Sequence, residues 1–159
     1  MKIKDEFKIY LTSLGRTKKI AEILSQNAKK GFFMCLHGDL GTGKTTFARF
    51  FINSLSDKKI NVPSPTFSMV QFYEFKKFNI WHYDLYRMSD IAEIFALDYD
   101  LAINDVVLIE WPEIIKDLLP LKRIDIFFKE DQNRKLYAKI KLIGDLKLNN
   151  NSLREYEEP

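Results

Sequence analysis

Residues 38–45 read Gly-Asp-Leu-Gly-Thr-Gly-Lys-Thr and satisfy the pattern G-x-x-x-x-G-K-[ST] in full. A continuous apolar run, residues 32–36, precedes this segment, and an apolar stripe at helical spacing follows it, formed by Phe47, Phe50, Phe51 and Leu55. A buried strand that turns through glycines into a helix makes a concave loop whose backbone N–H groups point at one anion. The segment therefore predicts a phosphate-binding loop within an α/β fold whose strands are buried on both faces.

Hydrophobic periodicity extends this α/β pattern over most of the chain. It predicts strands over 7–11, 32–36, 68–75, 79–84 and 106–109, and helices over 14–28, after the loop as far as 55, and over 91–97, 98–104 and 113–119. Alternation in 124–128 and 136–142 predicts a C-terminal β-hairpin with one buried face. Because 159 residues suit one domain, we assign residues 1–143 to it and residues 144–159 to a polar tail that we expect to fray from Asn149 onward.

Composition excludes several classes of protein. The 25 Lys and Arg against 22 Asp and Glu give a net charge of only +3, with no obvious clustering of the kind that nucleic-acid binders need. The single cysteine, Cys35, excludes an internal disulfide and a Cys-cluster zinc site, and two histidines disfavour a histidine-based metal site. No apolar run is long enough to cross a membrane and the start resembles no signal peptide, so we expect a cytoplasmic protein without a membrane partner.

Each residue type in the loop has a chemical reason to be there. Glycines let the backbone fold around an anion, Lys44 can neutralise the β- and γ-phosphates, and the Thr45 hydroxyl can coordinate Mg²⁺. A chance glycine-rich turn is the alternative, and the flanking strand and helix speak against it. The guanine-reading motif N-K-x-D is absent, which favours ATP over GTP. The residues expected to bind the nucleotide are Gly38, Asp39, Leu40, Gly41, Thr42, Gly43, Lys44, Thr45 and Thr46.

Two predicted strands end in acids. Glu110 follows the apolar run 106–109, and Asp84 follows residues 80–83. The carboxyl ends of parallel strands converge on the ligand crevice, so both acids can reach a nucleotide. The alternative for each acid is a helix cap or a solvated loop residue. Thr66, in a proline-rich stretch about twenty residues after Lys44, is either a switch threonine that senses the γ-phosphate or part of a connector without a ligand.

Four segments occur together in one order: residues 38–46, Ser-Pro-Thr at 64–66, His-Tyr-Asp-Leu-Tyr-Arg at 82–87, and Glu-Trp at 110–111. In this combination the sequence resembles the TsaE (formerly YjeE) family of bacterial ATPases in tRNA threonylcarbamoyladenosine biosynthesis. The resemblance covers roughly residues 10–143. It implies a P-loop NTPase-like three-layer fold with a central, mostly parallel sheet, and a single ATPase domain over residues 1–143.

The resemblance also implies an activity: slow, Mg²⁺-dependent ATP hydrolysis that resets or regulates a threonylcarbamoyl transfer complex of the TsaB and TsaD proteins. Contact with tRNA would then be indirect, through that complex. Carried over by position, Lys44 holds the phosphates, and Thr45 and Glu110 hold Mg²⁺. Thr66 belongs to a switch-like loop, and Trp111 lies beside the nucleotide. The catalytic residues implied are Asp84, Glu110 and Lys44.

Several alternatives stay open from sequence. A small-molecule kinase or a nucleotide-sensing adaptor without hydrolysis carries the same loop, and either Asp84 or Glu110 can orient the attacking water. Trp111 can equally pack at a strand end. His82 reads as a core histidine, and no role is expected for His37.

Overall fold

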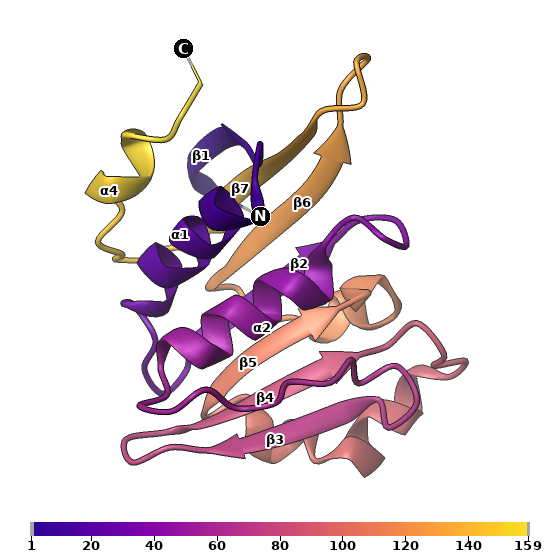
Figure 1. Cartoon of the computed structure of the whole chain (residues 1–159). Helices are drawn as coiled ribbons and strands as arrows, with labels where there is room; N and C mark the ends of the chain where they lie inside the picture. Colours follow the sequence, from indigo (N-terminus) through magenta and orange to yellow (C-terminus); the bar gives the residue numbers. More distant parts are fainter. Residues whose placement is uncertain (1, 159) are drawn as a thin grey trace.

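The fold is built on one seven-stranded sheet, described by a computed structural model over residues 2–158. Its strand order is β1-β7-β6-β2-β5-β4-β3 (Figure 1). The strands are β1 (Ile3–Tyr10), β2 (Phe33–His37), β3 (Val70–Glu74), β4 (Asn79–Asp84), β5 (Val106–Glu110), β6 (Arg123–Glu130) and β7 (Leu136–Ile143). The central strands β6, β2, β5 and β4 run parallel, whereas β1, β7 and β3 pair antiparallel at the edges.

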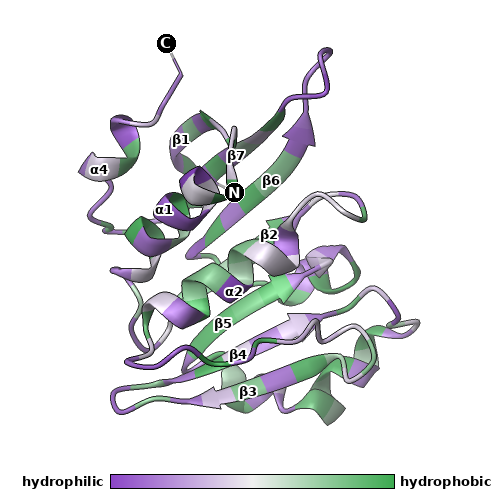
Figure 2. Ribbon diagram, in the orientation of Figure 1, coloured by the Kyte–Doolittle hydropathy of each residue, from purple (hydrophilic) through white to green (hydrophobic). Residues whose placement is uncertain are grey.

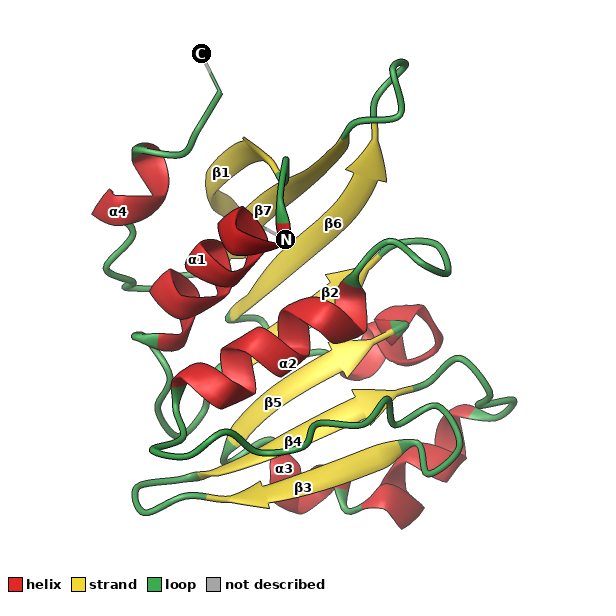
Figure 3. Cartoon of the chain, viewed as in Figure 1, coloured by secondary structure: helices red, strands yellow, loops and turns green. Residues whose placement is uncertain are grey.

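Helices cover both faces of this sheet (Figure 3). On one face lie α1 (Leu14–Ser25) and α2 (Lys44–Ser54), and on the other lie η1 (Ile91–Leu97), α3 (Tyr99–Ala102) and η2 (Pro112–Leu118). The predicted three-layer α/β class, with a mostly parallel centre and a C-terminal hairpin of β6 and β7, is confirmed. The helices predicted over 91–97 and 113–119 form as 3₁₀ turns, and Ile115 interrupts the second with a non-helical φ of −108°.

The central strands are apolar because both of their faces are covered. All five residues of β5 are buried, and in β2 only the last, His37, is partly exposed. Figure 2 shows that β5 is hydrophobic along most of its length. Successive residues of β2 pack alternately into two hydrophobic cores, one on each face of the sheet. Met34 and Leu36 face α1 and α2, whereas Phe33 and Cys35 face the 3₁₀ layer. The continuous apolar runs that predicted these strands thus reflect a two-sided core.

The C-terminal tail corrects one expectation. Within residues 149–158 the chain folds back onto the domain and forms α4 (Asn151–Arg154), whose Leu153 side chain is fully buried in the core beside α1. The Arg16 guanidinium donates to the carbonyl of Tyr156 over 3.0 Å, and the Glu158 N–H donates to the carbonyl of Lys8 over 3.0 Å. A lone leucine among polar residues has no periodicity, so its burial leaves little trace in the sequence.

Parallel pairing brings the ends of three strands to the same end of the sheet (Figure 1). Leu36 of β2 pairs with Glu110 of β5, and Glu110 pairs in turn with Asp84 of β4. The loops that follow β2, β4 and β5 therefore meet at one place. Among residues 2–158, no helix is long and apolar enough to cross a membrane.

The docked tail gives a stability prediction. Leu153→Ala removes a fully buried side chain, so it should lower the free energy of unfolding by about 3 kcal/mol and Tm by roughly 6–12 °C. Ser152→Ala, at the exposed neighbouring position, is the control and should change Tm by little. Thermal melts of the three proteins check this. Equal melting temperatures for the leucine variant and wild type would show that the tail does not contribute to the core.

Candidate functional site at the ends of the parallel strands

The loop between β2 and α2 can adopt its path only with glycine at particular positions. Gly43 caps α2 with a φ of 100°, in the left-handed region that favours glycine. At Gly38 a Cβ atom would lie 2.6 Å from the Thr42 hydroxyl and 3.0 Å from the carbonyl oxygen of Phe128. The backbone geometry therefore requires glycine at both positions, Gly38 and Gly43. Asp39, Leu40 and Gly41 form the exposed crest of this loop.

Lys44 is buried inside the loop rather than extended into solvent. Its Nζ donates to the carbonyl oxygens of Gly38, over 2.5 Å, and Asp39, over 2.7 Å, and lies 4.4 Å from the centre of the Trp111 ring. Burial lowers the pKa of this ammonium below its ordinary value, although Glu110 and Asp84 act to raise it. The positive charge is thus held beside the N-terminus of α2, where an anion would be favoured.

Glu110 is held from two sides. The Thr45 hydroxyl donates to its Oε1 over 2.8 Å, and Nε2 of His82 lies 2.7 Å from its Oε2. His82 is fully buried and only 2% of the Glu110 side chain is exposed. With the carboxylate as acceptor, Nε2 carries the proton, and Nδ1 of His82 has no partner among the described residues. A buried carboxylate is tolerated when it is hydrogen-bonded in this way.

The contact between His82 and Glu110 is the main feature of the site that the sequence did not predict. The expectation of a buried core histidine is met, but its ring also contacts an expected metal ligand. Register explains the contact. His82 pairs with Leu108, and Glu110 lies two residues beyond Leu108 on the same face of the sheet. Aligning the acid-terminated strands by their last residues would have placed this histidine beside Glu110.

Asp84 and Thr66 are brought together. The Thr66 hydroxyl donates to Oδ2 of Asp84 over 2.9 Å and lies 2.8 Å from the hydroxyl of Ser64. The N–H of Tyr86 donates to the other oxygen, Oδ1, over 3.0 Å. Asp84 is 4% exposed and pairs in register with Glu110. The proline-rich loop is therefore fastened to the acid at the end of β4.

Trp111 lies at the site with an unusual backbone. Its φ of 58° and ψ of 54° lie in the left-handed region, which is rare for a bulky residue and is found at strained functional positions. The ring packs against Lys44 and, at 5.0 Å between centroids, against Tyr86. Arg87 lies over the exposed ring of Phe67, 5.0 Å from its centre, which joins the loop of Thr66 to the segment after β4.

A cavity of about 610 Å³ opens beside the loop between β2 and α2. Its lining comes from the loop and from the outer end of β6: His37, Gly38, Asp39, Leu40, Thr42, Phe127, Phe128, Lys129 and Glu130. Thr46 lies outside it, in the first turn of α2 and half-buried. The loop therefore has space on its β6 side that a ligand larger than a phosphate could enter.

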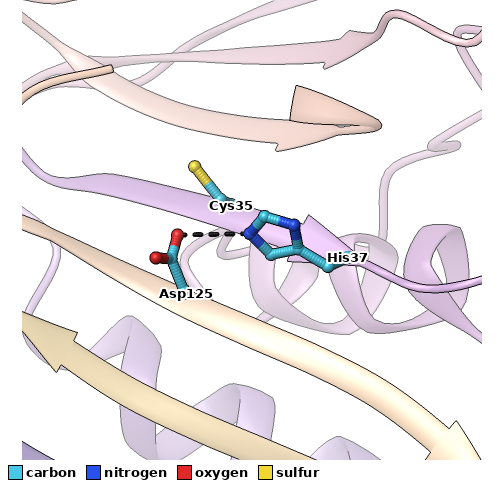
Figure 4. Close-up of side chains that lie close together, drawn as sticks. All are labelled: Cys35, His37 and Asp125. Carbon is cyan, nitrogen blue, oxygen red and sulfur yellow. Dashed lines mark hydrogen bonds and ion pairs between the residues drawn. The ribbon is translucent and has the colours of Figure 1, made fainter. Parts of the chain in front are cut away.

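On the face of the sheet opposite α2, His37 lies at the centre of a network of charged side chains. Its Nε2 lies 3.2 Å from Asp125 Oδ1 (Figure 4). Its Nδ1 lies 3.3 Å from Glu113 Oε1, and its ring stacks on Phe127. Burial acts to lower the pKa of His37, but the bonds to the two carboxylates raise it above its ordinary value. The Arg123 guanidinium donates to Asp125 over 3.2 Å. These contacts of His37 were not expected from the sequence, which predicted no particular role for it.

The fold and the loop first define a class: an α/β protein of the P-loop type. A family model described as "Threonylcarbamoyl adenosine biosynthesis protein TsaE" matches residues 11–137. The chain belongs to the TsaE family, a family of tRNA threonylcarbamoyladenosine biosynthesis. The resemblance found in the sequence is confirmed.

Individual relatives agree with this assignment. The "tRNA threonylcarbamoyladenosine biosynthesis protein TsaE" of Rickettsia prowazekii is 44% identical over 79% of this chain and 89% of its own length. The protein of the same name from Bacillus subtilis is 40% identical over 71% of each chain. A crystal structure of YdiB from Bacillus subtilis superposes with a TM-score of 0.73 at 29% identity, covering 91% of this chain and 90% of that one.

The His37 network gives a pH prediction. The contribution of the protonated His37 ring to the free energy of unfolding is complete below pH 6.5, the ordinary pKa of histidine. It is lost as the pH rises through the raised pKa of His37 in the folded state. Burial acts to raise the pKa of Asp125, but His37 and Arg123 lower it below its ordinary value of 3.8. The hydrogen bond to His37 lowers the pKa of Glu113 below its ordinary value of 4.5, and each carboxylate contributes above its ordinary value. The network therefore stabilises the fold most between pH 4.5 and 6.5.

Urea unfolding of wild type and His37→Gln should differ by about 1 kcal/mol near pH 5.5 and by less near pH 9. Lys18→Ala, at an exposed position of α1, is the control and should show no such pH dependence. A difference that grows toward alkaline pH would contradict the charge assignment.

Proposed function

We propose that this chain is a Mg²⁺-dependent ATPase that serves threonylcarbamoyladenosine modification of tRNA. One observation carries the proposal: the buried Lys44 ammonium and the Thr45–Glu110 pair lie side by side at the N-terminus of α2. A cation inside an anion-binding loop, next to a hydroxyl and a carboxylate, is the donor set that a nucleotide triphosphate with its metal requires. Membership of the TsaE family supports the pathway.

The residues present fit both ligands. The carbonyls that Lys44 now contacts are replaceable partners, so its ammonium can turn to the β- and γ-phosphates. Thr45 and Glu110 offer hard oxygen donors 2.8 Å apart, which suit Mg²⁺. They would hold the ion, which when bound neutralises phosphate charge. The absence of an N-K-x-D motif favours ATP as the nucleotide.

Asp84 and Glu110 are the candidates for orienting the attacking water. Both oxygens of each acid are engaged, but Glu110 is bonded to Thr45 and to the buried His82 and is the expected Mg²⁺ ligand. Asp84 is bonded to the backbone N–H of Tyr86 and to the hydroxyl of Thr66, which lies in the proline-rich loop. Asp84 is therefore the better candidate for this second task. Thr66 can leave Asp84 for a γ-phosphate, which gives the loop a way to sense the nucleotide.

Hydrolysis by such a site rests on positioning and charge stabilisation. We infer that the chain alone is slow and that the TsaB and TsaD proteins act on the loop of Thr66, with tRNA engaged through their complex. Phe67 and Leu40, 85% and 67% exposed beside the site, are apolar groups that such partners can cover. The proposed compartment is the cytoplasm, where ATP and tRNA are both present.

Phosphate release from ATP tests the proposal directly. We expect Mg²⁺-dependent release that the purified TsaB–TsaD pair of the same organism stimulates and that Lys44→Ala abolishes by weakening nucleotide binding. Glu110→Ala should reduce turnover by at least about 100-fold. The matched control is Lys58→Ala, an exposed lysine at the other end of the sheet, which should retain activity.

Two results would contradict the ATPase proposal. ATP binding without phosphate release, even in a single turnover with the pair present, would indicate a nucleotide-sensing adaptor. Transfer of the phosphate to a hydroxyl compound would indicate a small-molecule kinase.

His82 should act as a positioning residue for Glu110. A glutamine side chain carries its amide nitrogen near the place of Nε2, whereas asparagine reaches only the place of Nδ1. His82→Gln should therefore keep the Mg²⁺ concentration for half-maximal turnover within about threefold, and His82→Asn should raise it by roughly 10–100-fold. Circular dichroism verifies that both are folded. An equal shift in both variants would reduce His82 to a packing role.

A further inference from the structure

Three side chains with metal-binding atoms converge on the face of the sheet opposite α2. Cys35 of β2 pairs in register with Asp125 of β6, and His37 lies two residues beyond Cys35 on the same face. The Cys35 sulfur, a ring nitrogen of His37 and a carboxylate oxygen of Asp125 all lie within 4.8 Å of one another (Figure 4). Cys35 is fully buried, Asp125 is 4% exposed, and the side chain of His37 is 16% exposed.

Both ring nitrogens of His37 face carboxylates, and the pair at Nε2 needs a positive charge between its atoms, which a ring proton or a metal ion can supply. In the neutral ring that donates from Nδ1 to Glu113, the lone pair of Nε2 is directed at Asp125. Nε2 and the carboxylate oxygen then meet as two acceptors 3.2 Å apart, which is unfavourable unless a proton or a metal ion lies between them. A carboxylate that holds the second nitrogen of a histidine is the usual support of a metal-bound imidazole.

We propose that Cys35, His37 and Asp125 form a zinc site, with Sγ, Nε2 and a carboxylate oxygen as protein ligands and water as the fourth. Zinc bonds of about 2.0–2.2 Å to nitrogen and oxygen place tetrahedral ligands about 3.3–3.5 Å apart. The observed 3.2 Å between His37 and Asp125 is close to that edge. Binding breaks the S–H bond of Cys35 and, in a doubly protonated ring, the Nε2–H bond of His37, and these protons leave to solvent. Zn–S, Zn–N and Zn–O bonds form in their place, and the proton on Nδ1 stays in the hydrogen bond to Glu113.

Charge supports the proposal. A thiolate, the carboxylates of Asp125 and Glu113, and the Arg123 guanidinium sum to a charge of −2, which Zn²⁺ balances. Arg123 donates to Oδ1 of Asp125 and also to the carbonyl of Pro120, so it fixes the orientation of the carboxylate. Entry is from the exposed edge of His37, which also lines the cavity beside the phosphate-binding loop.

The donor set separates this site from the Thr45–Glu110 pair. Sulfur and imidazole ligands select zinc over Mg²⁺, which prefers oxygen. The two sites also lie on opposite faces of the sheet, because Cys35 faces the 3₁₀ layer whereas Thr45 is on α2. Zinc here would tie β2 to β6 at the residue directly before Gly38 and so stiffen the root of the phosphate-binding loop.

Cobalt tests the proposal without any measurement of ATP turnover. The full chain, freed of metal with a chelator, is titrated with Co²⁺, which reports a thiolate ligand through a near-ultraviolet charge-transfer band. We expect this band, its displacement by Zn²⁺ but not by excess Mg²⁺, and its loss in Cys35→Ser and Cys35→Ala. Glu113→Gln should keep the band with affinity weakened by roughly 10–100-fold.

Glu110→Gln is the matched control, because it alters the oxygen-ligand pair and leaves the cysteine site intact; it should keep the band. Two cysteine variants are used so that misfolding of one, monitored by circular dichroism, leaves the other informative. Absence of the band in folded wild type at millimolar Co²⁺, or its persistence in either folded cysteine variant, would overturn the proposal. Displacement by Mg²⁺ would do so as well.

Discussion

Glu110 is a carboxylate withdrawn from water, and the arrangement of the whole site depends on how its charge is compensated. The Thr45 hydroxyl reaches it from the first turn of α2 and the His82 ring from β4, so one side chain joins a helix and two strands. Removing either donor would leave a buried charge with an unmade hydrogen bond, which costs more than the bond itself contributes. The same two contacts fix where a cation could be bound. The hydrogen bonds of Thr45 and His82 to Glu110 thus both stabilise the fold and preorganise the site.

Around Glu110, the other residues of the site are linked to it in a chain of contacts. Asp84 lies beside it in register, Thr66 is bonded to Asp84, and the exposed Phe67 follows Thr66. On the other side Trp111, with its left-handed backbone, brings its ring to Lys44. A change at the nucleotide can therefore reach an exposed apolar surface through three residues. In the proposed ATPase, these contacts would connect the nucleotide to a partner protein.

Much of the fold was predictable because the residue pattern within a single strand or loop indicates the structure that this segment adopts. The apolar runs at 32–36 and 106–109 report strands covered on both faces, and the glycines of the loop report a backbone path that a Cβ would block. The meeting of Thr45 with Glu110 follows from parallel pairing. What escaped prediction depends on lateral register or on isolated residues. His82 reaches Glu110, and His37 reaches Asp125, only once neighbouring strands are aligned, and Leu153 is a single apolar residue in a polar tail.

The central claim is that Glu110, held by Thr45 and His82, makes nucleotide binding depend on Mg²⁺. The most direct measurement is the affinity of wild type and Glu110→Gln for a non-hydrolysable ATP analogue, by calorimetry, with Mg²⁺ and with a chelator. The account predicts that Mg²⁺ strengthens binding to wild type by at least about tenfold and has little effect on the folded variant. The same Mg²⁺ dependence in both proteins would contradict it.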